Sequence, residues 1–141
     1  MSEPVCPDKG NAIISERIAA FNESGFARLL GMNILQASDG FARVVMESGP
    51  MTNPHGVVHG GAIFSLADQA FGIAANCAGV DRVAVSVHIQ YIAPATGRLE
   101  ATAERVADNG HYSQFRVMVF ENNLIIAAFD GIALQVNPPP E

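Results

Sequence analysis

Tryptophan is absent from this chain of 141 residues, and charged side chains are scarce. Asp, Glu, Lys and Arg make up 16% of the residues, whereas apolar residues make up 49%. Because so little charge is unusual for the surface of a small monomer, we expect another subunit to cover part of the apolar surface. A chain of this length folds as one domain and needs neither disulfides nor a metal to complete its core.

Positive charge is the scarcer sign. The 8 Lys and Arg residues are opposed by 14 Asp and Glu residues, and the net charge is −6. This balance argues against non-specific binding to nucleic acid and to an anionic membrane surface. A polyanionic ligand therefore needs a local basic patch, for which the candidates are Arg82, Arg98, Arg105 and Arg116.

Cysteine is nearly absent as well, because Cys6 and Cys77 are the only two. Two distant cysteines form no disulfide framework and lack the spacing of metal ligands. Residues 1–11 have neither the basic nor the apolar segment of a signal peptide. The apolar stretch 62–79 approaches transmembrane length, but it contains Asp68 and other polar residues and so predicts a core helix. We therefore expect a soluble cytoplasmic protein.

Hydrophobic spacing and turn residues predict the order of the elements. The apolar spacing in residues 12–22 predicts a short amphipathic helix, with another turn at 26–30. A long buried helix is expected to follow the glycines at positions 60 and 61. Strands are expected at residues 32–37, 41–47, 82–91, 98–107, 111–121 and 124–136.

These elements predict an α+β domain. Asn- and Gly-containing separators between the last three strands indicate an antiparallel meander. The expected fold is one long central helix wrapped by a curved antiparallel sheet of five to six strands. Because the last strand is apolar on both faces, a second subunit is expected to cover the other face of the sheet. Residues 11–136 form the predicted domain, between a disordered tail at 1–10 and a Pro-rich tail at 137–141.

The turn His59-Gly60-Gly61 opens the most apolar helix of the chain. A helix N-terminus leaves backbone N–H groups unpaired, and the helix dipole favours negative charge there. Since Gly60 and Gly61 have no Cβ, a ligand oxygen can approach those N–H groups. This arrangement is typical of an oxyanion hole, although a pair of glycines is also compatible with a tight turn alone.

The polar residues of this helix fall on one narrow stripe at 100° per residue. The stripe fits either an ordinary solvent-exposed face or a surface that a ligand or another backbone approaches closely. Its glycines and its lack of Lys, Arg and Glu favour the second interpretation. Desolvation there is expected to raise the pKa of Asp68. The stripe consists of Gly61, Ser65, Asp68, Gln69, Gly72 and Asn76.

The turn and the helix together resemble the signature of hotdog-fold acyl-CoA thioesterases of the phenylacetate-degradation (PaaI-like) type. The resemblance extends from about residue 26 to residue 136 and includes Ser86 and the strand ending Gln90-Tyr91-Ile92-x-Pro94. The matching residues of the turn and helix are Asn53, Gly56, His59, Gly60, Gly61 and Asp68, which lies eight positions after Gly60.

The resemblance implies a role for each matched residue. The N–H of Gly60, with that of Gly61, would hold the thioester oxygen, and Asp68 would act as nucleophile or as the base that activates water. His59 and Asn53 would order the loop and the substrate carbonyl, whereas Ser86 would help to position water. No metal or cofactor is implied, because coenzyme A is part of the substrate. Further substrate contacts are expected from Phe64, Gln69, Arg82 and His88.

Helix geometry indicates that two subunits share each active site. Eight helical residues at 1.5 Å each separate Gly60 from Asp68 by about 12 Å. An oxyanion donor and a base that serve one carbonyl must each lie about 3 Å from the reacting atoms. We therefore predict that Gly60 of one subunit works with Asp68 of another, in a homodimer or a dimer-of-dimers homotetramer.

Three alternatives stay open. A hotdog-fold enoyl-CoA hydratase or dehydratase would pair His59 or His88 with Asp68 for proton transfer at carbon. A non-catalytic acyl-CoA-binding protein on the same fold would have no use for Asp68. The third alternative makes His55 and His59 a metal-binding pair, which a glycine between them disfavours.

Overall fold

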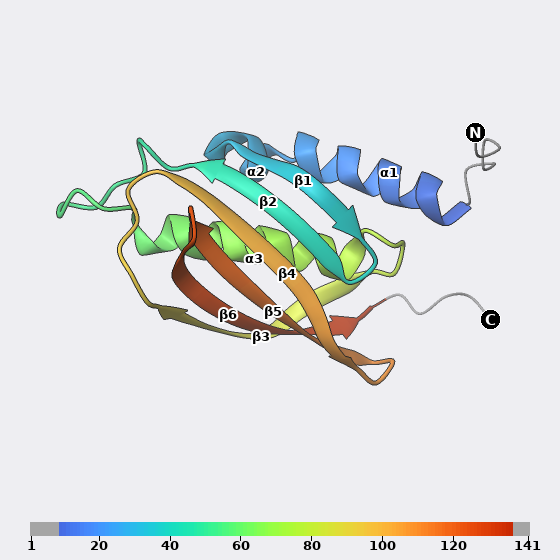
Figure 1. Cartoon of the computed structure of the whole chain (residues 1–141). Helices are drawn as coiled ribbons and strands as arrows, with labels where there is room; N and C mark the ends of the chain where they lie inside the picture. Colours follow the sequence, from blue (N-terminus) through green and yellow to red (C-terminus); the bar gives the residue numbers. More distant parts are fainter. Residues whose placement is uncertain (1–8, 137–141) are drawn as a thin grey trace.

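The computed structural model describes residues 9–136, and the elements follow the predicted order (Figure 1). Every strand end lies within one residue of its predicted position. In this range the helices are α1 (Lys9–Glu23), α2 (Gly25–Leu30) and α3 (Gly60–Asn76), and the strands are β1 (Met32–Ser38), β2 (Phe41–Glu47), β3 (Arg82–Tyr91), β4 (Arg98–Asp108), β5 (Tyr112–Glu121) and β6 (Leu124–Gln135).

The six strands form one antiparallel sheet in the order β1-β2-β4-β5-β6-β3. Strands β4, β5 and β6 are neighbours, which confirms the predicted meander. Strand β3 comes directly after α3 in the chain but lies at the far edge, beside β6. Helix α3 packs against one face of the curved sheet, behind it in Figure 1, and this confirms the predicted two-layer α+β arrangement.

The buried face of α3 forms the centre of the core. Its side chains include Leu66 and Ile73, which are fully buried. The ring of Phe71 packs against Phe115 and Phe129 on the sheet, with ring centroids 5.4 and 5.7 Å apart. Under that ring lies Gly131, where an added Cβ would come within 2.9 Å of Phe71. The close approach of helix and sheet thus depends on a residue without a side chain.

Strand β3 is an edge strand that the other described residues leave largely exposed. Its alternating pattern predicts a half-buried strand, but Val83 and Val85 are 47% and 50% exposed. Only Ile89 of this strand packs against the core within the described residues. A β-bulge between Ala84 and Ser86 interrupts the pairing with β6. The free edge of β3 therefore presents apolar side chains and unpaired backbone groups.

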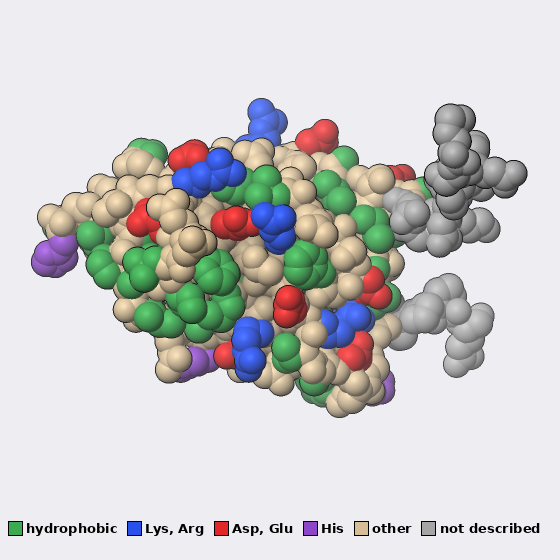
Figure 2. Space-filling view, in the orientation of Figure 1, with side chains coloured by type: hydrophobic (Ala, Val, Ile, Leu, Met, Phe, Trp, Pro, Cys, Tyr) green, Lys and Arg blue, Asp and Glu red, His purple; other side chains and the backbone are tan. Residues whose placement is uncertain are grey.

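The face of the sheet that points away from α3 also carries apolar surface. In Figure 2, which views this face, hydrophobic side chains gather over one end of the sheet. Met118 and Phe120 border a hollow of about 310 Å³ there. Leu124 and Ile125, at the start of β6, are exposed.

The structure tests only some of the predictions about the ends of the chain, its cysteines and its membrane segments. Residues 1–8 and 137–141, and Cys6 with them, lie outside the described residues. Residues 9 and 10, predicted as tail, form the start of α1. Cys77 is buried, as expected of a structural thiol. No helix within residues 9–136 is long and apolar enough to cross a membrane.

We predict that Gly131→Ala destabilises the fold, because its Cβ would overlap the Phe71 ring at the centre of the core. Overpacking of this kind costs about 1–3 kcal/mol. Gly25→Ala is the matched control, since no atom lies within 4 Å of its added Cβ. Thermal unfolding followed by circular dichroism should show a lower Tm for Gly131→Ala only; equal Tm values would contradict this account of the core.

Candidate active site

The loop before α3 is closed by backbone hydrogen bonds. The His59 N–H donates to the Met51 carbonyl at 2.8 Å, and Thr52 and Val58 form an isolated β-bridge. The Val58 N–H donates to the Ala95 carbonyl at 2.8 Å, which ties the loop to the segment after β3. These bonds fix the direction in which the chain enters the helix.

Asn53 organises the inside of this loop. Its backbone N–H donates to Val57 at 2.8 Å, and its side-chain Oδ1 accepts the N–H of His55 at 2.9 Å. Gly56 adopts a φ of +80°, a left-handed conformation that favours glycine. The geometry agrees with the predicted loop-ordering role of Asn53. His55 is exposed, and no group of three or more His, Cys, Asp and Glu side chains within residues 9–136 has metal-binding geometry.

His59 is the N-cap of α3. Its backbone is extended, and its Nδ1 accepts the N–H of Gly61 at 2.8 Å. The imidazole is therefore engaged as an acceptor at Nδ1, and the Gly61 N–H is already occupied. Within the described residues the N–H of Gly60 has no acceptor. Of the two glycines predicted to bind the thioester oxygen, only Gly60 has a free donor.

The predicted stripe is the exposed side of α3. Two of its polar side chains bond back to their own helix: Ser65 Oγ donates to Gly61 O at 2.7 Å, and Asn76 Nδ2 donates to Gly72 O at 2.9 Å. The carboxylate of Asp68 has no hydrogen-bond or ion-pair partner among residues 9–136. Asp68 is thus an unpaired acid in an otherwise uncharged helix.

Asp68 combines surface exposure with a raised pKa. The side chain is exposed in a single chain, yet the bulk of the surrounding apolar residues desolvates its carboxyl and raises its pKa above the ordinary value of 3.8. The shift has the predicted direction. A carboxylate that is reluctant to stay ionised is a stronger base for proton abstraction.

Gly60 and Asp68 lie on the same side of α3 but about 12 Å apart along its axis. Five surface hollows of about 130 to 310 Å³ on the described residues are lined by residues other than these two. In one subunit, therefore, about two turns of helix separate the oxyanion donor from the acid.

Comparison with known proteins shows which family the chain belongs to. Residues 55–123 match the thioesterase superfamily. The acyl-coenzyme A thioesterase PaaI of Escherichia coli is 39% identical over 89 residues, which are 61% of this chain and 64% of that protein, just under two thirds. A putative esterase of Deinococcus radiodurans is 39% identical over 113 residues, which are 75% of each chain.

The fold agrees. The solved structure of the E. coli PaaI protein from the phenylacetic acid degradation operon superimposes with a TM-score of 0.85 and 28% identity. The match covers 92% of this chain and 97% of that one. The chain belongs to the thioesterase superfamily. Its six-stranded sheet and long helix are the hotdog fold of the PaaI-like members, and the predicted resemblance is confirmed.

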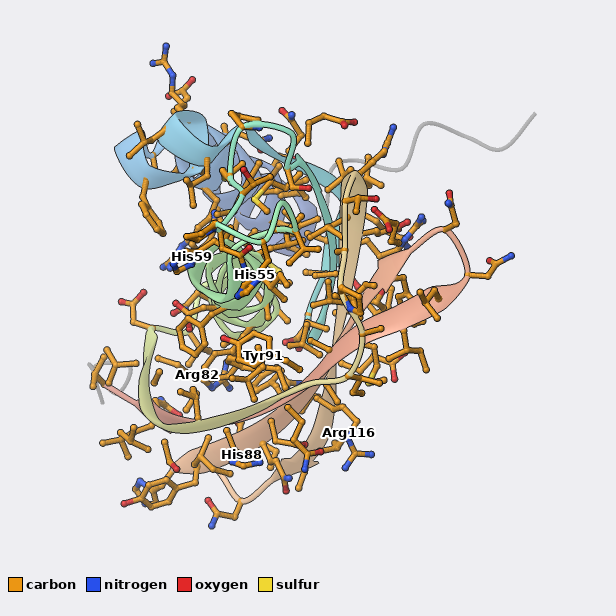
Figure 3. The ribbon with its side chains drawn as sticks, turned by 90° about the vertical axis from the view of Figure 1, so that its left-hand side faces the viewer. His55, His59, Arg82, His88, Tyr91 and Arg116 are labelled. Carbon is orange, nitrogen blue, oxygen red and sulfur yellow. The ribbon has the colours of Figure 1, made fainter. Side chains whose placement is uncertain are left out.

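In this chain, Ser86 and His88 lie on the face of the sheet opposite α3. Ser86 pairs with Ile132 and His88 with Asp130, whereas the intervening Val87 pairs with Gly131, which packs under α3. Figure 3 shows His88 on the outer side of the sheet. Because paired residues point to the same face, Ser86 and His88 of one chain do not lie beside Asp68 of that chain. Their roles, water positioning for Ser86 and substrate contact for His88, stay predictions.

Arg82 also differs from its predicted role. Its guanidinium is only 9% exposed and donates through Nη1 to the Ala75 carbonyl at 2.6 Å, at the end of α3. Asp108 lies 3.9 Å from its other terminal nitrogen. This arginine caps the helix C-terminus, so it is not free to hold a phosphate.

The remaining residues that were predicted to contact the substrate lie in the core, on the exposed stripe or in surface ion pairs. Phe64 is partly buried and packs edge-to-face on Phe129 at 5.7 Å, which makes it mainly a core residue. Gln69 lies beside Asp68 on the exposed stripe. The other candidate arginines pair with acids: Arg98 with Glu47, Arg105 with Asp39 and Arg116 with Asp130.

Tyr91 reaches this site although sequence reasoning gave it no role. Its hydroxyl donates to the Gly60 carbonyl at 3.0 Å, and Figure 3 shows its ring between β3 and α3. The signal in the sequence was its alternation with Ile89, which placed both on one face of the strand, and its place in the strand ending that matches the family.

We predict that Asp68→Asn stabilises the fold at pH 7. Desolvation raises the folded-state pKa, so the protonated form is favoured and stability is lost as pH rises through that pKa. The difference in Tm between variant and wild type should shrink as pH falls toward 3.8. Asp108→Asn is the control and should change the Tm in the opposite direction, because the Gly110 N–H lowers the pKa of Asp108. A Tm difference between Asp68→Asn and wild type that does not vary with pH would refute the desolvation of Asp68.

Proposed function

We propose that this protein hydrolyses the thioester of small, aromatic or medium-chain acyl-CoA molecules to the free acid and CoA. The observation that carries the proposal is that two groups of α3 have no partner among residues 9–136: the Gly60 N–H and the Asp68 carboxylate. Membership of the thioesterase superfamily and the name of the E. coli relative, an acyl-coenzyme A thioesterase, support the same reaction. The buried, unpaired thiol of Cys77 supports a reducing cytoplasmic location.

The Gly60 N–H, at the positive end of α3, receives the thioester carbonyl oxygen and stabilises the charge that develops there. Asp68 removes a proton from water as the water oxygen bonds to the carbonyl carbon. Collapse of the tetrahedral intermediate breaks the C–S bond, and the sulfur leaves with the proton that Asp68 had taken. Asp68 supplies the base, so the scheme requires no metal or cofactor.

Asp68 has a second mode of action, as a nucleophile that forms an anhydride with the acyl group. A raised pKa is compatible with both routes, because it makes the carboxylate a stronger base and a stronger nucleophile. A single turnover in ¹⁸O-labelled water distinguishes the two, because only the nucleophilic route later places the label in the Asp68 side chain.

A two-fold dimer through β3 would complete the site. The uncovered edge of β3 offers backbone pairing and the exposed side chains of Val83, Val85 and Val87. Pairing of two such edges brings two α3 helices together on one side of a continuous sheet. The Asp68 stripe of one subunit then faces the start of α3 in its partner. Gly60 and Asp68 of the same site thus come from different helices, and the separation of about 12 Å along one helix no longer matters.

The outer face of the sheet supports a further association of dimers. Its apolar surface around Met118 and Phe120, with the adjoining Leu124 and Ile125, is uncovered in a single chain. Burial of this surface between two sheets is the arrangement we propose for a homotetramer.

The hydratase and binding-protein alternatives have less support. A hydratase needs a histidine free for proton transfer, but His59 Nδ1 is bound to Gly61 and His88 lies on the opposite face. A non-catalytic binder gains nothing from an unpaired carboxylate beside the phosphates of CoA.

We predict that Asp68→Asn lowers kcat at least about 100-fold, the usual contribution of a positioned acid or base. The assay measures thiol release from a panel of aromatic, medium-chain and short-chain acyl-CoA thioesters, with EDTA present. Asp130→Asn, which alters a carboxylate on the outer face, should leave activity unchanged. Unchanged hydrolysis by the Asp68 variant would show that another group supplies the base. Loss of enoyl absorbance without thiol release would instead identify a hydratase.

We predict that two inactive variants restore activity when mixed. Gly60→Pro removes the donor N–H and also adds side-chain atoms beside the Tyr91 ring; proline is tolerated at the first helical position, and His59 is extended. Gly60→Ala, which adds a Cβ but keeps the N–H, controls for that contact. In an equal mixture with Asp68→Asn, half of the dimers are mixed and each has one intact site, which gives about a quarter of wild-type activity.

A mixture of Asp68→Asn with Asp68→Ala is the control, since neither subunit supplies the acid. No recovery after complete subunit exchange would place Gly60 and Asp68 of the same chain in one site.

A further inference from the structure

We propose that Tyr91 is a positioning residue for the oxyanion donor, an inference that rests on the proposed thioester hydrolysis. Tyr91 closes β3 and lies 31 positions after Gly60 in the chain. It contacts the first residue of α3 in two ways, through its hydroxyl and through its ring.

The hydroxyl bond fixes one end of the peptide group between Gly60 and Gly61. Tyr91 Oη donates to the carbonyl oxygen of this group at 3.0 Å, and His59 Nδ1 accepts its N–H at 2.8 Å. One peptide plane is therefore held at both ends by side chains from two different elements. Glycine has no side chain to restrain its own backbone, so these two bonds supply the restraint.

The ring of Tyr91 also lies against Gly60. A Cβ added at this position would lie 3.3 Å from Tyr91 Cζ and 3.4 Å from Cε1. The aromatic ring thus packs directly against the glycine backbone and occupies the space that a side chain would need. Together, ring and hydroxyl limit the rotation of Gly60 and hold its N–H in one direction.

That direction matters because Gly60 provides the free N–H of the turn, the neighbouring Gly61 N–H being occupied. A single donor stabilises an oxyanion only when it is already aimed at the position of the developing charge. Loss of the clamp would lower kcat with little change in KM, because the ground-state thioester oxygen depends less on this alignment.

The test compares Tyr91→Phe, which keeps the ring and loses the hydroxyl, with Tyr91→Leu, which loses both. We expect kcat to fall about three- to tenfold for Tyr91→Phe, as for one net hydrogen bond, and further for Tyr91→Leu, with KM within about twofold of wild type. Tyr112→Phe is the matched control, since Tyr112 is an exposed tyrosine at the start of β5. Its kcat should equal that of wild type.

The ring contact has an independent readout. The change in Tm caused by Gly60→Ala should be less favourable when Tyr91 is present than in a Tyr91→Ala background, because removal of the ring makes room for the Cβ. If the Tm changes of the two single variants simply add in the double variant, the proposed contact between the ring and Gly60 would be wrong.

The outcomes separate the inference from the function on which it rests. A wild-type kcat for Tyr91→Phe, even with a lowered Tm, would make Tyr91 merely structural and leave the hydrolase intact. Absence of hydrolysis by the wild type across the acyl-CoA panel would instead overturn the proposed function, and the positioning role with it.

Discussion

The burial of α3 is the constraint on which the rest of the structure depends. Between Gly60 and Asn76 the helix has one charged residue, Asp68, and almost every other position is apolar or small. Such a helix is stable in water only when most of its circumference is covered. The curved sheet covers all of it except one stripe, and the acid lies on that stripe.

A second consequence of this packing is that the site uses backbone as much as side chains. The core requires close contact between helix and sheet, as Gly131 under the Phe71 ring shows. At the start of α3 the same closeness lets Tyr91 rest on Gly60. The helix dipole then supplies positive potential at the start of α3. A chain poor in Lys and Arg can bind a developing oxyanion in this way.

The features that could be predicted from the sequence are those that depend on local patterns of residues. The Asn- and Gly-containing turns determine where strands β4, β5 and β6 end, and the His59-Gly60-Gly61 turn determines where α3 begins. The exposed stripe and the raised pKa of Asp68 follow from helical periodicity. These features depend on residues within a few positions of one another, so a single sequence contains them.

The errors concern contacts between distant elements. The buried guanidinium of Arg82 meets the end of α3 and Asp108, which no local pattern indicates. The contact of Tyr91 with Gly60 depends likewise on how β3 crosses the helix. Strand alternation places Ser86 and His88 on the face opposite Ile89 and Tyr91. Only the family resemblance suggests that Ser86 belongs to the active site.

The open edge of β3 has a consequence for the life of the protein in a cell. An unpaired strand with exposed valines can pair with a free strand of another chain. In the proposed dimer this edge is covered by the partner subunit. A subunit that has folded but has not yet met its partner would then be the form most vulnerable to aggregation.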